Sequence, residues 1–140
     1  MLQRLIYFSA RGAGCEDITA LVAESAARNR TRGITGMLIA DDAYFLQVLE
    51  GPRPIVSRLF QTISRDPRHS DVVLVEAEEI RQQVYPDWGM TQLDDVAKIA
   101  GLWWRVSSER PFDLASMKCR EIKDFLRLVS FEMIGARPAA

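Results

Sequence analysis

The sequence holds few residues of the kinds that bind metals, form cross-links or act as nucleophile and base. Its 140 residues include only two cysteines and one histidine, His69. Cys15 and Cys119 stand far apart and belong to no CxxC motif or Cys/His cluster, so neither a zinc site nor a disulfide framework is indicated. With a single histidine, no Ser-His-Asp or Cys-His arrangement can be read from the chain.

An excess of charge of one sign and long apolar runs are lacking as well. Lys and Arg number 18 against 19 Asp and Glu, a formal net charge of -1, which makes no electrostatic case for binding nucleic acid or an anionic membrane. No window approaches the ~18 consecutive apolar residues of a spanning helix. The first residues do not read as a signal peptide, and Gly12 and Gly14 form a lone GxG without the rest of a phosphate loop. We expect a cytoplasmic protein.

What is present is enough apolar sequence, 48% of the residues, to bury the core of one domain. Asp17 opens a predicted helix that Gly33 stops, and a second helix begins at 51–54 and ends at the Asp66-Pro67 break. Alternating or apolar runs predict strands at 5–8, 34–40, 43–49, 72–75 and 88–93. The strands at 34–40 and 43–49 look central because both faces of each carry apolar residues. This order predicts an α+β, ferredoxin-like βαββαββ sandwich with two helices on one sheet face.

The other face of such a sheet needs a cover, and the end of the chain offers one. A segment that starts at Pro111 carries an apolar stripe at helical spacing, formed by Ile122, Phe125, Leu126, Val129 and Met133. Trp103 and Trp104 precede it. On an extended segment these neighbours would point in opposite directions, one toward the sheet and one toward a partner.

Two amides fall on faces that should be buried. Asn29 lies on the same helical side as Ile18 and Val22, and a buried amide without a partner costs about 1–3 kcal/mol. A bond within the helix end near Gly33 is the simple structural explanation. Gln47 shares a strand face with apolar neighbours, where a bond to adjacent backbone is the equivalent explanation.

A phenol, an indole and a thioether accompany the amides. Tyr7 lies on the face of Leu5 and Ser9, and Trp88 and Met90 share a face two residues apart. The simple structural explanation for each of these three side chains is packing in the hydrophobic core. Together with the amides they lie on elements that can converge over one helix-covered sheet, which suits a planar, hydrogen-bonding, redox-active ligand better than hydrolysis.

These residues also stand in recognisable motifs. Tyr7, the pattern Asn29-x3-Gly33-Ile34-Thr35-Gly36 and the run Phe45-Leu46-Gln47-Val48-Leu49-Glu50-Gly51-Pro52 resemble the BLUF family of flavin-binding light sensors. The segments 66–69 and 86–90 extend the match, which covers about residues 2 to 93. The resemblance implies a non-covalently bound flavin, FAD with FMN as a second choice, between the two helices.

The resemblance also implies roles. Tyr7 is the electron and proton donor to the excited flavin, Gln47 bridges Tyr7 and the ring, and Asn29 holds the ring's carbonyl and imide edge. Trp88 and Met90 match the pair linked to signal exit; Met90 is counted among the cofactor-binding residues, although family members differ in which of the two packs beside the flavin. Further matches to cofactor-lining positions are Ser25, Ile63, Asp66, Arg68 and His69, and Arg28 stands at a position that helps to seat the flavin in some members of the family. Arg28 is a departure, because several relatives carry asparagine or histidine there.

The implied organisation is a flavin-binding unit at 1–93 and a helical extension at 94–140 packed on the same domain. The extension resembles no cyclase, phosphodiesterase or DNA-binding motif, so we expect a photoreceptor that is no enzyme, forms a homo-oligomer and signals to a partner protein by contact. Two alternatives remain open. One is a small acylphosphatase-like hydrolase with Arg11 and Asn29 as anion holders, and the other is a light-independent ligand-binding regulator on the same fold.

Overall fold

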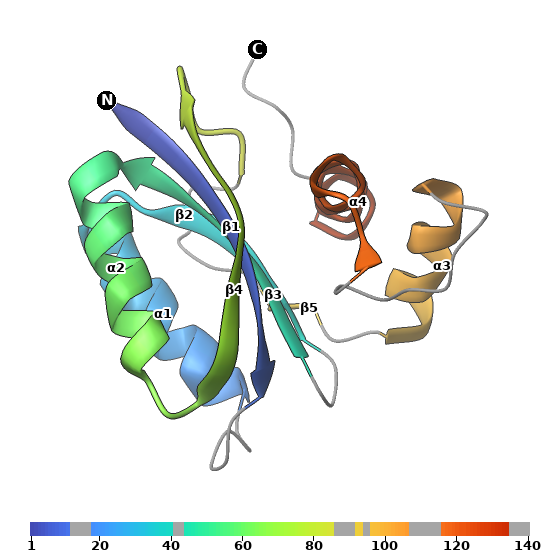
Figure 1. Ribbon diagram of the computed structural model, residues 1–140, viewed down its shortest axis with the longest axis horizontal. Helices are drawn as coiled ribbons and strands as arrows, with labels where there is room; N and C mark the ends of the chain where they lie inside the picture. The colour runs from blue at the N-terminus through green and yellow to red at the C-terminus, as the bar shows by residue number, and fades with distance from the viewer. Residues whose placement is uncertain (12–17, 41–43, 86–91, 94–95, 107–115, 135–140) are drawn as a thin grey trace.

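A central sheet organises the molecule in the computed structural model (Figure 1). The structure describes residues 1–11, 18–40, 44–85, 92–93, 96–106 and 116–134. Within them, five strands form one sheet in the order β4-β1-β3-β2-β5. The neighbours among the first four are antiparallel, and β5 pairs in parallel with β2. The strands are β1 (Leu2–Arg11), β2 (Thr35–Ala40), β3 (Tyr44–Pro52), β4 (His69–Ile80) and β5 (Gln92–Leu93).

Helices cover both faces of this sheet (Figure 1). On one face lie α1 (Ile18–Thr31) and α2 (Arg53–Arg65), and on the other lie α3 (Val96–Val106) and α4 (Cys119–Val129), which continues into the short π-helix η2 (Ser130–Ile134). This arrangement confirms the predicted α+β, ferredoxin-like sandwich, including helical cover on the second face. None of the described helices is both long and apolar enough to cross a lipid bilayer.

The ends of α1 and α2 follow from local sequence. Gly33 follows α1 with a φ of 72°, a left-handed conformation that glycine adopts without strain. Pro54 lies in the first turn of α2, where its missing N–H costs no helical hydrogen bond. Asp66 ends α2 in an extended conformation (φ -75°, ψ 125°), as expected for a residue that precedes proline.

Three strands occupy the interior of the sheet, and their side chains alternate between two cores. All six residues of β2 are buried, which confirms that the predicted strands at 34–40 and 43–49 are central. Facing α1 and α2 are side chains such as Leu5, Tyr7 and Leu49. On the opposite face, Ile6 and Val48 belong to the core under α4.

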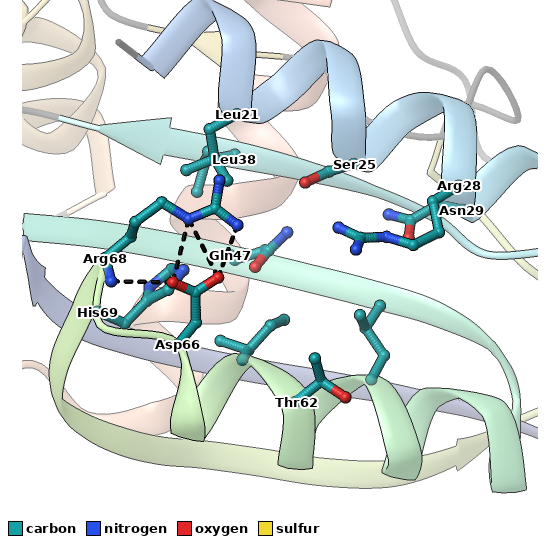
Figure 2. A pocket seen from close by; sticks show the side chains of 12 residues that line it. Leu21, Ser25, Arg28, Asn29, Leu38, Gln47, Thr62, Asp66, Arg68 and His69 are labelled. Atoms are coloured by element: carbon teal, nitrogen blue, oxygen red, sulfur yellow. Dashed lines mark hydrogen bonds and ion pairs between the residues drawn. The ribbon is translucent and has the colours of Figure 1, made fainter. Parts of the chain in front are cut away.

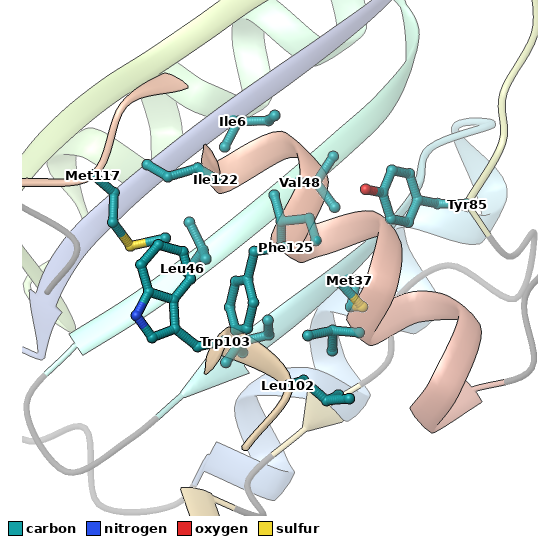
Figure 3. Close-up of a cluster of buried hydrophobic side chains, with 13 residues drawn as sticks. Ile6, Met37, Leu46, Val48, Tyr85, Leu102, Trp103, Met117, Ile122 and Phe125 are labelled. Carbon is teal, nitrogen blue, oxygen red and sulfur yellow. The ribbon is translucent and has the colours of Figure 1, made fainter. Parts of the chain in front are cut away.

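The core under α4 consists of one continuous apolar cluster (Figure 3). Trp103 of α3 and Phe125 of α4 meet edge to face with ring centroids 5.8 Å apart, a favourable arrangement for aromatic rings. Side chains from β1, β2 and β3 form the floor of this cluster. The predicted stripe is confirmed as buried for Ile122, Phe125, Leu126 and Val129, whereas the side chain of Met133 lies outside the described residues.

One prediction for the C-terminal part was wrong. Trp103 and Trp104 do not lie on an extended segment, because both belong to helix α3. Trp103 is fully buried and Trp104 is 51% exposed, so the expected split between core and solvent still holds. A helix achieves it because neighbouring residues differ by about 100° around its axis.

Two strands also differ from their predicted bounds. β4 runs from His69 to Ile80, well beyond the predicted 72–75. It is an edge strand with many exposed polar residues, so a search for apolar runs detects only its middle part. For the predicted strand at 88–93, the structure describes only Gln92–Leu93 as strand. Trp88 and Met90 lie outside the described residues.

The burial of α4 leads to a stability prediction. Phe125 is fully buried and Phe131 is 60% exposed, so the two phenylalanines form a matched pair. We expect Phe125→Ala to lower the free energy of unfolding by about 3–5 kcal/mol through cavity formation, and Phe131→Ala to change it by less than about 0.5 kcal/mol. Urea unfolding followed by circular dichroism measures both, and equal losses would contradict this packing.

Candidate ligand-binding site

A cavity opens between α1 and α2 above the sheet (Figure 2). It encloses about 550 Å3 outside protein atoms, part of it open to solvent. Its walls combine aliphatic side chains with amides, a hydroxyl pair and charged groups. The lining residues are Leu21, Ser25, Arg28, Asn29, Leu38, Gln47, Leu59, Thr62, Ile63, Asp66, Arg68 and His69.

Helical spacing explains how each helix presents one lining face. On α1 the lining residues Leu21, Ser25, Arg28 and Asn29 follow one another at steps that return to one side of a helix. On α2 the lining residues Leu59, Thr62 and Ile63 do the same. The sequence analysis missed Leu21, Leu38, Leu59 and Thr62 as lining residues, although extending the same periodicity from Asn29 and Ile63 would have found those on the helices.

Tyr7 and Gln47 form a buried pair at the base of the site. The two residues are direct partners in the β1–β3 register, and the Tyr7 hydroxyl donates a hydrogen bond to Gln47 Oε1. Burial raises the pKa of Tyr7 far above its ordinary value, and the nearby negative charge of Asp66 adds to this. The phenol therefore keeps its proton at neutral pH and can donate this hydrogen bond.

Asn29 has a buried oxygen that bonds to none of the described residues. The side chain is 1% exposed and its Oδ1 atom has no hydrogen-bond partner among them. The turn after α1 is closed instead by the backbone carbonyl of Asn29, which accepts from the N–H groups of Arg32 and Ile34 at 3.0 Å each. Local bonding therefore leaves the amide oxygen unsatisfied, at a cost of about 1–3 kcal/mol, and a ligand donor can pair with it.

Asp66 and Arg68 form a charged clamp at one end of the cavity. Arg68 Nη2 lies 2.6 Å from Asp66 Oδ2, and Arg68 Nε lies 3.0 Å from Asp66 Oδ1. These bonds lower the pKa of Asp66 and raise that of Arg68. Glu24 of α1, which the sequence analysis did not single out, also reaches Arg68 at 3.3 Å.

His69 closes the same end of the cavity. Its Nδ1 atom lies 2.9 Å from Ser9 Oγ, and its ring packs against Phe45 with centroids 4.9 Å apart. Burial lowers the pKa of His69 below its ordinary value, and the charges of Asp66 and Arg68 act on it in opposite directions. We expect a neutral ring at neutral pH.

The structure brings most of the predicted residues together. Every predicted cofactor-binding residue within the described chain lines the cavity except Tyr7, which lies behind Gln47. Met90 and Trp88 fall outside the described residues. Arg11, the anion holder of the hydrolase alternative, is not among the lining residues, and its guanidinium lies over the Phe45 ring at 5.7 Å from the centroid.

The chemistry of the site defines a class of protein. Aliphatic walls accept a flat aromatic ring, whereas the amides of Asn29 and Gln47 can pair with the polar edge of such a ring. Within the described residues no group of three or more His, Cys, Asp or Glu side chains could hold a metal ion. The fold and the site therefore define a small α+β domain with a cavity between two helices whose lining suits a planar heterocycle.

Comparison with known proteins identifies the family. Residues 2–91 match the BLUF model, described as "Sensors of blue-light using FAD". The chain belongs to the BLUF family. This membership agrees with the sensor prediction and not with the hydrolase or the light-independent regulator.

The relatives differ in how much of their length resembles this chain. The photoactivated adenylate cyclase subunit beta of Euglena gracilis is 38% identical over 54% of this chain, which spans only 9% of that relative. BlsA in its photo-activated state is 26% identical, with a TM-score of 0.81, 100% of this chain and 99% of BlsA covered. BlrP1 of Klebsiella pneumoniae, solved with FMN and cyclic diGMP, is 38% identical with a TM-score of 0.64, covering 67% of this chain and 26% of BlrP1.

The buried histidine gives a pH prediction. The folded pKa of His69 lies below the unfolded value of about 6.5, so the unfolded state takes up its proton first as the pH falls. His69 thus stabilises the fold fully above about pH 6.5, and this contribution is lost on acidification through the folded pKa.

Two measurements check this prediction. NMR titration of the chain's single imidazole should give a midpoint below 6.5. The free energy of unfolding of the native protein should fall as the pH drops from 7 through the unfolded pKa of about 6.5, and His69→Gln should flatten that slope. A midpoint above the unfolded value would mean that a nearby carboxylate, not burial, dominates the environment of the ring.

Proposed function

We propose that this chain is a blue-light photoreceptor that binds FAD, or FMN, non-covalently in the α1–α2 cavity and has no catalytic output of its own. The observation that carries the proposal is the buried hydrogen bond from Tyr7 to Gln47, with Gln47 opening onto the cavity. In this proposal residues 1–93 form the flavin-binding unit and 94–140 a helical extension.

The lining residues provide the types of contact that a flavin needs: hydrogen-bonding groups for its polar edge and apolar side chains for its ring. Asn29 Oδ1, buried and unsatisfied within the described chain, offers an acceptor for the imide N–H of the ring. Leu21, Leu38 and Ile63 supply apolar contact. The polar groups proposed to hold the remainder of the cofactor are Ser25, Arg28, Gln47, Asp66, Arg68 and His69.

Tyr7 and Gln47 carry the proposed photochemistry. A bound flavin supplies absorption of blue light and an excited state that accepts an electron. Tyr7 is the proposed donor: a phenol that has lost an electron becomes strongly acidic, and its proton moves along the existing hydrogen bond to Gln47 Oε1. The amide of Gln47 then turns over or changes tautomer, which exchanges donor for acceptor toward the cavity.

A chain of buried charges offers a route from β3 to the opposite face of the sheet. Glu50, on the same strand as Gln47 but facing the α4 side, is fully buried. It accepts hydrogen bonds from Arg4 Nε at 2.7 Å and from the N–H groups of Val84 and Tyr85 at 2.7 and 2.9 Å. Glu50 therefore ties the flavin-side strand to the segment that leads to residues 86–93.

The same network reaches helix α4. Arg4 Nη1 lies 2.9 Å from Glu78 Oε1, which in turn lies 3.1 Å from Nζ of Lys123 on α4. Burial opposes ionisation of Glu78, but its bonds to Lys123 and Arg4 outweigh burial and lower its pKa. Contiguous bonds of this kind supply a physical route for coupling between two elements.

We propose that the signal leaves through the fifth strand and the C-terminal helices to a separate partner protein. Two large apolar side chains on these helices are exposed, Trp104 at 51% and Phe131 at 60%. Arg105 and Glu132, their neighbours in sequence, form an ion pair at 3.0 Å that joins α3 to η2. This surface is the proposed output side of a cytoplasmic homo-oligomer.

The photochemical roles give the first functional prediction. Tyr7→Phe and Gln47→Leu should each retain flavin but lose the reversible light-induced red shift of its absorption, because each removes one member of the hydrogen-bond chain with little change in volume. Tyr85→Phe is the matched control, since Tyr85 is equally aromatic and buried but belongs to the α4-side core. A normal red shift in either site variant would refute the assignment.

The proposed output route gives the second functional prediction. Amide hydrogen exchange of residues 88–133 should differ between dark and illuminated protein, and Met90→Ala should lose this difference while keeping the flavin red shift. Exchange that is identical in both states of the native protein would show that the C-terminal helices are a static cover.

A further inference from the structure

The two guanidinium groups that line the cavity are in different electrostatic states. Arg68 is neutralised by Asp66 at 2.6 Å and by Glu24 at 3.3 Å. Arg28 has no ion pair or side-chain hydrogen bond with any residue in the described part of the chain. In Figure 2 its side chain reaches from α1 into the cavity, on the other side of Gln47 from the Arg68–Asp66 clamp.

The charge of the lining is therefore unbalanced. Arg28 and Arg68 are positive, Asp66 is the one acidic residue among the lining side chains, and burial keeps His69 neutral at pH 7. Among the lining side chains alone one positive charge remains, and Arg28 carries it, because Arg68 is paired with Asp66 and with Glu24, which lies outside the lining. A charge-assisted bond from a guanidinium to an anionic oxygen is roughly twice as strong as a neutral hydrogen bond.

Exposure and polarity separate the cavity into two parts. Asn29 and Gln47 are buried, as are Leu21, Leu38 and Leu59, which suits an uncharged ring. Arg28, which lines the same cavity, is exposed to solvent. A phosphate loses least hydration at such a position, because burying an ion is far more costly than burying a neutral group.

We propose that Arg28 binds the phosphate of the flavin nucleotide, so that this cavity selects FMN and FAD over riboflavin. The inference rests on the proposed function, because it assumes that the cavity binds a flavin. It makes Arg28 a specificity-determining residue, in contrast to Asn29 beside it, whose buried amide faces the part of the ligand that all three flavins share.

Flavin-free protein titrated with riboflavin, FMN and FAD tests this by quenching of flavin fluorescence. In the native protein both nucleotides should bind at least about tenfold more tightly than riboflavin, as expected for one partly exposed charge-assisted bond. Arg28→Gln should weaken FMN and FAD binding about tenfold and leave riboflavin unchanged, whereas Arg28→Lys should retain part of the preference. Higher salt should weaken FMN binding to the native protein more than to Arg28→Gln.

Two further variants make the result specific. Arg30→Gln removes the same charge from α1 outside the cavity lining and should change none of the affinities, and Asn29→Ala should weaken all three flavins alike. Equal weakening of riboflavin and FMN in Arg28→Gln, or no weakening of either, overturns the proposal. Failure of the native protein to bind any of the three would instead refute the proposed function.

Discussion

The pairing of β1 with β3 is the constraint on which the rest of the site depends. It sets Tyr7 opposite Gln47 on one face of the sheet and Arg4 opposite Glu50 on the other. A slip of one residue would send each side chain to the wrong face, so it would break the phenol–amide bond and separate the buried charges of Arg4 and Glu50. Removing one partner of a buried ion pair costs several kcal/mol, and Arg4 and Glu50 thereby hold Tyr7 and Gln47 in register.

Close approach of β2 to β3 adds a second restriction on the same strand. A Cβ atom on Gly36 would lie 2.0 Å from the backbone oxygen of Val48, so only glycine fits there without a shift of β3. Because β3 is held by β1 on one side and by β2 on the other, it has little freedom to slide. The proposed change at Gln47 should therefore act through side-chain packing and hydrogen bonds rather than through displacement of the whole strand.

Periodicity predicted the parts of the site that lie on one element. Helical spacing placed Asn29 inward and strand alternation did the same for Gln47, because each depends on a single local pattern. The role of Glu24 was not predicted because its partner Arg68 lies on a different element. The role of Glu50 was not predicted because the sequence of an apolar strand does not indicate which cation pairs with its carboxylate. The helix at Trp103 was missed because tertiary packing outweighs the weak preference of tryptophan for strands.

The site thus separates photochemistry from affinity. Tyr7 and Gln47 satisfy one another within the protein, so this part of the site is formed before any ligand enters. Asn29 Oδ1 has no hydrogen-bond partner within the described chain. A ligand that donates a hydrogen bond to it therefore removes the free-energy cost of a buried, unsatisfied oxygen. Binding to the native state alone stabilises it in proportion to the logarithm of ligand concentration over Kd. The fold should therefore gain stability from flavin chiefly through the Asn29 side, while the response to light, as proposed, depends on the Tyr7–Gln47 pair that is already complete.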